Sequence, residues 1–228
     1  MVVVSEASAA TTRIRVDPSR TLSATMVDEV TMVGEGGALG GGPAPVVVLW
    51  LAGGHAAADA WPGPAAASTI EAWEHALRRI ERLPAITVGV LDGRCGAAAL
   101  ELLLTADYRM ATRGASVSLP APGEAWPGML LHRFVQQCGL IAARRVILLG
   151  GDADAEALTA CDAVDRVSQD PAGEIDAIVA RAAGVDGRDV ALRRQLLFDA
   201  VTVDFEEALG THLAACDRVL RRAAGTGR

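Results

Sequence analysis

Two short apolar runs, VVVLWL at Val46–Leu51 and AITVGVL at Ala85–Leu91, most constrain how this chain can fold. A continuous apolar run of this length is typical of a buried β-strand. The segment between them has the apolar spacing of a helix, and Ser68 and Glu71 form a predicted capping box at its start. Because strands and helices alternate along the chain, the sequence predicts an α/β fold.

The composition excludes several functional classes. The 228 residues carry a net charge of −7 and include neither lysine nor asparagine. Without lysine the chain has no Schiff-base residue, no pyridoxal-phosphate anchor and no P-loop lysine. The negative charge makes nucleic acid and anionic membranes poor partners, and no apolar run approaches the roughly 18–20 residues of a membrane span.

The start of the chain lacks the basic segment of a signal peptide, so we expect a cytoplasmic protein. Its four cysteines are widely scattered and form no CxxC pair, which predicts reduced thiols in that compartment. These cysteines are Cys95, Cys138, Cys161 and Cys216.

Motifs for hydrolase or metal chemistry are weak. GASVS at Gly114–Ser118 does not match the GxSxG nucleophile elbow, and the histidines form no HExxH motif. His55 and Asp59 match the HxxxD pattern of some acyl transferases, although an alanine-rich loop can contain such a pair by chance. No cluster supplies the three or four ligands of a zinc site, so we expect no metal.

A turn followed by a small-residue helix is more informative. The predicted strand ends at Leu91, and alanines at 97–99 then open a helix that contains Glu101. The first amides of a helix lack internal partners, and small side chains let a ligand oxygen approach them, as in an oxyanion hole. Glu101 follows Ala98 by three residues and therefore lies on the same helix face. Burial among leucines would make it a usable acid or base, whereas the alternative is an exposed glutamate in a good helix-forming segment.

The segment LPAITVGVLDGRCGAAALELLLTADYRMA resembles the signature of the crotonase (enoyl-CoA hydratase/isomerase) family, and the likeness continues from Val46 to Val167. It implies a spiral of strand–strand–helix turns with C-terminal helices that assemble trimers or hexamers. It also implies an acyl-CoA thioester substrate, with coenzyme A as part of the substrate and no other cofactor. The matching positions are Pro84, Asp92, Gly93, Ala97–Ala99, Glu101 and Asp107.

The resemblance assigns roles to several residues. It places one oxyanion-hole amide at Ala98 and the other near Ala56, and it makes Glu101 the first of two catalytic glutamates. The second would follow Pro120, where this chain has Ala121. Glu124, three residues later, is the candidate to replace it.

Within the family, the chain resembles the B-type crotonases of dihydroxyphenylglycine and glycopeptide antibiotic biosynthesis. The likeness includes WPG at Trp61–Gly63 and the segment Arg193–Arg222. It implies a dehydratase that assists a type III polyketide synthase and a sibling crotonase in forming 3,5-dihydroxyphenylacetyl-CoA. The alternative is a catalytically degraded accessory protein that stimulates these partners.

The expected organisation is a crotonase core over residues 1–170 and a helical assembly region over residues 171–228. Three helices are expected before the boundary, at about Met129–Gln137, Ile141–Leu149 and Ala153–Cys161. The last helix carries an apolar stripe at helical spacing, which indicates a docking or subunit face. The stripe consists of Phe205, Leu209, Leu213, Cys216 and Leu220.

Overall fold

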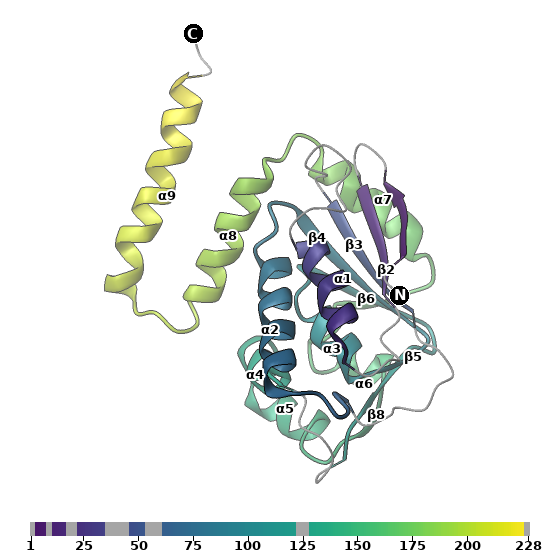
Figure 1. The fold of residues 1–228 in the computed structure, drawn as a ribbon. Helices are drawn as coiled ribbons and strands as arrows, with labels where there is room; N and C mark the ends of the chain where they lie inside the picture. Colours follow the sequence, from purple (N-terminus) through teal and green to yellow (C-terminus); the bar gives the residue numbers. More distant parts are fainter. Residues whose placement is uncertain are drawn as a thin grey trace.

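The computed structural model describes residues 3–7, 11–16, 22–34, 46–52, 61–121 and 128–225. The main sheet contains β1 (Val3–Ala7), β2 (Thr11–Val16), β3 (Val46–Ala52), β4 (Ile86–Asp92), β6 (Tyr108–Thr112) and β9 (Arg166–Ser168). Their order across the sheet is β1-β2-β3-β4-β6-β9, and all neighbours run parallel except β1 and β2 (Figure 1). The two apolar runs of the sequence are therefore the adjacent strands β3 and β4.

A smaller sheet lies beside the main one. Its strands are β5 (Arg94–Gly96), β7 (Ser116–Leu119) and β8 (Gly151–Asp154), in the order β5-β7-β8. The helices are α1 (Ala24–Gly34), α2 (Ala67–Glu81), α3 (Ala97–Leu103), α4 (Leu130–Cys138), α5 (Leu140–Val146), α6 (Ala155–Thr159), α7 (Pro171–Ala182), α8 (Gly187–Asp199) and α9 (Phe205–Gly225). Strands and helices alternate as the sequence predicts, and the α/β prediction is confirmed.

Helices cover both faces of the main sheet, which explains the continuous apolar sequence of its central strands. Val47 and Leu49 of β3 pack into the larger core, together with side chains of α1, α2 and α3. Val48 points to the opposite face and packs into a second core with Ile175 and Ala182 of α7. Successive side chains of a strand point to opposite faces, so both sets of positions must be apolar here.

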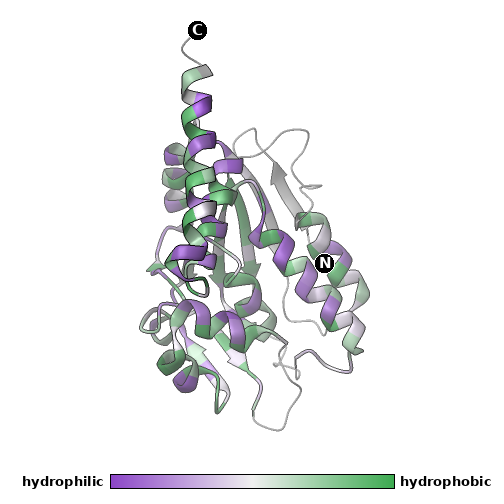
Figure 2. Cartoon of the chain, turned by 90° about the vertical axis from the view of Figure 1, so that its left-hand side faces the viewer, coloured by the Kyte–Doolittle hydropathy of each residue, from purple (hydrophilic) through white to green (hydrophobic). Residues whose placement is uncertain are grey.

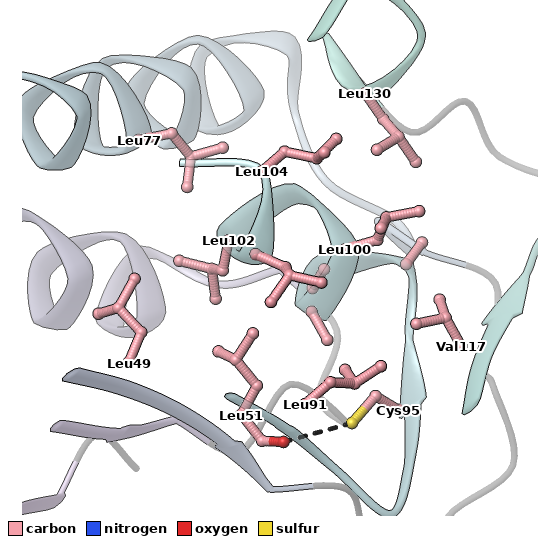
Figure 3. Packing of buried hydrophobic residues seen from close by; sticks show 14 of the residues in the cluster. Leu49, Leu51, Leu77, Leu91, Cys95, Leu100, Leu102, Leu104, Val117 and Leu130 are labelled. Carbon is pink, nitrogen blue, oxygen red and sulfur yellow. Dashed lines mark hydrogen bonds between the residues drawn. The ribbon is translucent and has the colours of Figure 1, made fainter. Parts of the chain in front are cut away.

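The short helix α3 lies at the centre of the larger core, and all seven of its residues are buried. Figure 3 shows Leu100 and Leu102 of α3 surrounded by other apolar side chains. The end of α3 and the turn after it pass close to β4 at Gly89, where an added Cβ would lie 2.8 Å from Leu103 Cδ1 and 3.2 Å from Ala106 Cβ. A glycine in this strand therefore allows α3 to approach the sheet closely.

Two local predictions are wrong. The N-cap of α2 is Ala66, which makes no side-chain capping bond, and Ser68 lies inside the first helical turn. The predicted capping box is therefore absent. The segment Ala153–Cys161 is divided between strand β8 and the short helix α6, whose N-cap is Asp154 with its carboxylate accepting from Ala157 N at 2.7 Å. The first residues of this segment form a strand because β8 pairs with β7. The sequence pattern of the segment alone does not reveal that pairing.

The last helix, α9, stands away from the body of the molecule (Figure 1), and apolar and polar residues alternate along it (Figure 2). Arg222 links it to the start of α8 through ion pairs with Asp186 at 2.7 Å and with Asp189. The predicted apolar stripe is exposed along the helix, and its large members are Phe205, Leu209, Leu213 and Leu220. No helix in the described part of the chain is long and apolar enough to cross a membrane.

Candidate active site

The turn and helix around Glu101 have the expected form. Strand β4 ends at Asp92, Gly93 adopts a φ of +74°, and Gly96 is the N-cap of α3. Glycine takes such a positive φ without steric cost, so the chain turns sharply after β4 into the short strand β5, which leads directly into α3. Glu101 has 0% of its surface exposed. The alternative of a solvent-exposed glutamate is therefore wrong.

Two tryptophans hold the Glu101 carboxyl. Trp61 Nε1 donates to Oε1 at 3.3 Å, and Trp73 Nε1 of α2 donates a short hydrogen bond to Oε2. The two indoles meet edge to face, with ring centroids 5.5 Å apart and an interplanar angle of 66°. Both rings are themselves buried, so they fix the position of the carboxyl and separate it from water.

Burial raises the pKa of Glu101 from 4.5 to about 8. Desolvation is the main cause, because a charged carboxylate loses its hydration inside an apolar core. The nearby negative charge of Glu74 also raises the pKa, whereas the hydrogen bonds from Trp73 and Trp61 and the positive charge of Arg133 oppose the rise. A pKa near 8 favours the protonated form of the Glu101 carboxyl at neutral pH.

A buried ion-pair network lies next to this carboxyl. Arg133 of α4 pairs with Glu74 through Nη1 at 2.6 Å and with Glu81 through Nε at 3.0 Å, both of α2. Glu74 Oε1 also accepts from Met129 N at 2.9 Å. Opposite charges and a backbone amide thus compensate the burial of two carboxylates.

The predicted oxyanion-hole and second-glutamate residues are only partly placed. Ala98 is the second residue of α3 and is fully buried, one turn before Glu101. The amide of an α-helical residue normally donates to the carbonyl four residues earlier. For Ala98 that carbonyl lies before the start of α3, so its amide is suited to an acceptor outside the helix. Ala56 and Glu124 lie outside the described residues, and their roles stay predictions. The HxxxD pair, His55 and Asp59, also lies outside them.

Two acidic residues of the family signature hold the fold together. Asp92 accepts from Trp50 Nε1 at 3.0 Å and from Thr112 Oγ1 at 2.9 Å. Asp107 accepts from Thr87 N at 2.8 Å and from the guanidinium of Arg194 in α8. Asp92 therefore joins strands at the end of β4, and Asp107 anchors a C-terminal helix.

Sequence reasoning did not assign functions to Trp61, Trp73, Glu74 and Arg133. Trp61 and Trp73 gain a role only from the hydrogen bonds that they donate to Glu101. Among the described residues, no group of histidine, cysteine and acidic side chains could hold a metal ion. None of the four cysteines forms a disulfide bond in the structure.

Comparison with known proteins gives the family. A protein of Amycolatopsis orientalis called enoyl-CoA hydratase is 39% identical over 212 residues, covering 92% of this chain and 96% of its own length. An enoyl-CoA hydratase/isomerase structure from Marinobacter aquaeolei superposes with a TM-score of 0.81 at 19% identity, covering 99% of this chain and 94% of that one. A protein of Thermobifida fusca YX, assigned to the enoyl-CoA hydratases and crystallised with CoA, gives 0.77 at 18% identity, covering 96% and 93%.

No profile of a known protein family matches the sequence. The architecture is nevertheless that of a crotonase fold, and the alignment with the Amycolatopsis protein covers nearly the whole chain. The chain belongs to the crotonase (enoyl-CoA hydratase) family.

Proposed function

We propose that this protein is a dehydratase that removes water from a polyketide-CoA thioester, with Glu101 as the general acid. The observation that carries the proposal is the buried Glu101 carboxyl, whose pKa of about 8 keeps it protonated at neutral pH. It lies one turn after the small-residue start of α3, where the amide of Ala98 can donate a hydrogen bond to an oxygen that develops negative charge. CoA bound to the Thermobifida relative supports a CoA thioester as substrate.

The proposed elimination uses these groups in a defined order. A base removes the proton next to the thioester carbonyl, and the electrons move onto the carbonyl oxygen to form an enolate. The amides of Ala98 and Ala56 stabilise that oxygen, so no metal or redox cofactor is required. The enolate then re-forms the carbonyl, the carbon–oxygen bond to the hydroxyl breaks, and Glu101 donates its proton to release water. Glu124 is the proposed base.

The buried position of Glu101 places a condition on this reaction. Both carboxyl oxygens already accept from indoles, at 3.3 Å from Trp61 and at a shorter distance from Trp73. The longer bond is the weaker of the two. We therefore propose that the substrate hydroxyl displaces the Trp61 indole and reaches Oε1.

The particular reaction we propose is the formation of 3,5-dihydroxyphenylacetyl-CoA with a type III polyketide synthase and a sibling crotonase. The likeness of Arg193–Arg222 to the B-type crotonases supports this assignment. Loss of water from a cyclised polyketide produces an aromatic ring, so a dehydratase fits the chemistry of such a pathway.

A second proposal is an accessory role in the same pathway. Ala121 occupies the position of the second family glutamate, and Glu101 is fully buried. The exposed apolar side chains of α9 would then bind the synthase, the sibling crotonase or other copies of the chain. In this case Glu101 is a structural residue and its proton takes no part in catalysis.

Glu101→Gln in a reconstituted reaction separates the two proposals. Malonyl-CoA, the synthase and the sibling crotonase are combined with the variant, and the aromatic CoA product is measured. Loss of a general acid typically reduces a rate by about 100-fold or more. We expect such a loss, with assembly unchanged, from Glu101→Gln but not from Glu71→Gln on the exposed face of α2. Unchanged product formation by Glu101→Gln would favour the accessory role.

A further inference from the structure

The two carboxyls of Glu74 and Glu101 lie close together although they belong to different helices. A Cβ added at Gly128 would lie 2.6 Å from Glu74 Oε1 and 3.8 Å from Glu101 Oε1. These two oxygens are therefore no more than about 6.4 Å apart, which is the sum of the two distances. At such a separation in a buried site, the charge on one carboxyl affects the protonation of the other.

Arg133 and the backbone amide of Met129 fix the position of Glu74. Arg133 Nη1 lies 2.6 Å from Glu74 Oε2, and the amide of Met129 holds the other oxygen of the same carboxylate. The Arg133 side chain is only 9% exposed and the Glu74 side chain 16%, so water screens this pair weakly. Nε of Arg133 is held by Glu81 at 3.0 Å, which prevents the guanidinium from turning away.

We propose that the ion pair of Glu74 and Arg133 positions and controls the proton on Glu101. Glu74 holds the proton in place by repelling a second negative charge, and Arg133 limits that effect by neutralising Glu74. Burial provides the main barrier to ionisation of Glu101, and the neighbouring pair then adjusts the release of its proton, in a chain where the second family glutamate is Ala121. The inference rests on the proposed function of Glu101 as a proton donor, and it makes Glu74 and Arg133 positioning residues.

Other titratable groups on the elements around α3 are held by other partners, exposed to solvent or uncharged. On β4 and β5, Asp92 accepts from Trp50 and Thr112, Arg94 pairs with Asp152, and Cys95 donates towards Leu51 O. On α4, His132 is exposed and the pKa of Cys138 is raised by burial to about 11, so this thiol stays neutral. Glu74 and Arg133 are the charged groups that act on Glu101.

Tryptophan fluorescence provides a test that does not require a substrate. Because the indoles of Trp61 and Trp73 donate to Glu101, their emission should change when the carboxyl ionises. We expect the full-length protein to show a fluorescence transition with a midpoint near pH 8. This transition should be absent in Glu101→Gln, which identifies it as the titration of Glu101.

The variants of the ion pair should move this midpoint in opposite directions. Glu74→Gln removes the repelling charge and leaves Arg133 less neutralised, so the midpoint should fall by about one pH unit or more. Arg133→Met removes the attracting charge, so the midpoint should rise. The matched control is Glu81→Gln, which also removes one partner of Arg133 and should move the midpoint much less.

The outcomes separate this inference from the proposed function. Opposite shifts in Glu74→Gln and Arg133→Met support the ion-pair control, and Glu74→Gln alone tests the sign if Arg133→Met does not fold. Unchanged midpoints, shifts in one direction, or an equal shift in Glu81→Gln would overturn it. If the midpoints shift but product formation in wild type ignores pH between 7 and 9, the catalytic role of Glu101 fails while the ion-pair control stands.

Discussion

The free energy of unfolding of the wild-type protein should fall by several kcal/mol between about pH 5 and pH 8, compared with that of Glu101→Gln over the same range. The reason is the proton that folding places on Glu101. Its pKa rises from 4.5 in the unfolded chain to about 8 in the folded protein. Between these values the folded state binds one more proton than the unfolded state, so the free energy of unfolding falls by about 1.4 kcal/mol per pH unit.

The sign of this effect is specific to a carboxyl whose pKa is raised. The stabilisation is fully present below pH 4.5 and is lost as the pH rises through about 8. Urea unfolding of wild type and Glu101→Gln at each pH from 5 to 9 measures it, because the titrations of groups that do not interact with Glu101 cancel in the difference. Glu71→Gln, whose side chain is exposed, is the control and should follow wild type. Parallel curves for wild type and Glu101→Gln would contradict a raised pKa.

Arg194→Met should destabilise the protein by about 3–5 kcal/mol. The guanidinium of Arg194 pairs with Asp107 through two hydrogen bonds of 2.6 and 2.7 Å. It also donates to the carbonyls of Glu81, Leu83 and Ala85 at 2.6–3.0 Å, and the residue is only 5% exposed. Methionine fills the space but leaves a partly buried carboxylate and three carbonyls without this donor, which is the main cost.

The neighbouring residue provides the control for this prediction. Arg193 is exposed on the same helix, so Arg193→Met should change stability by no more than about 0.5 kcal/mol. Urea unfolding at one pH compares the two variants directly. Equal effects of the two substitutions would show that Arg194 does not anchor α8 to the core.

The central part of the fold could be predicted because its signals are local. VVVLWL and AITVGVL form the buried strands β3 and β4, and the apolar spacing between them forms α2. Strand β8 was not predicted because four residues carry little sequence signal and its pairing partner β7 lies far along the chain. The predicted Ser68 capping box is absent because α2 starts at Ala67, which places the serine inside the helix.

The candidate site was predicted less completely than the fold. The position of Glu101 after a small-residue helix start, with burial among leucines, led to a proton carrier, and its burial is confirmed. Its surroundings depend on contacts between distant segments. Trp61 and Trp73 are 40 and 28 residues from Glu101, and Arg133 is 59 residues from Glu74. Such contacts arise from tertiary packing, which local sequence patterns do not encode.

The measurement that tests the central claim most directly is the ionisation of Glu101 itself. Carbon-13 NMR of the glutamate carboxyls, with Glu101→Gln to assign the signal, gives the pKa of this one group as the pH is raised. A proton donor buried between two indoles should titrate near pH 8, and its signal at pH 7 should be that of the protonated acid. Titration between pH 4 and 5, as for an exposed glutamate, would contradict the account.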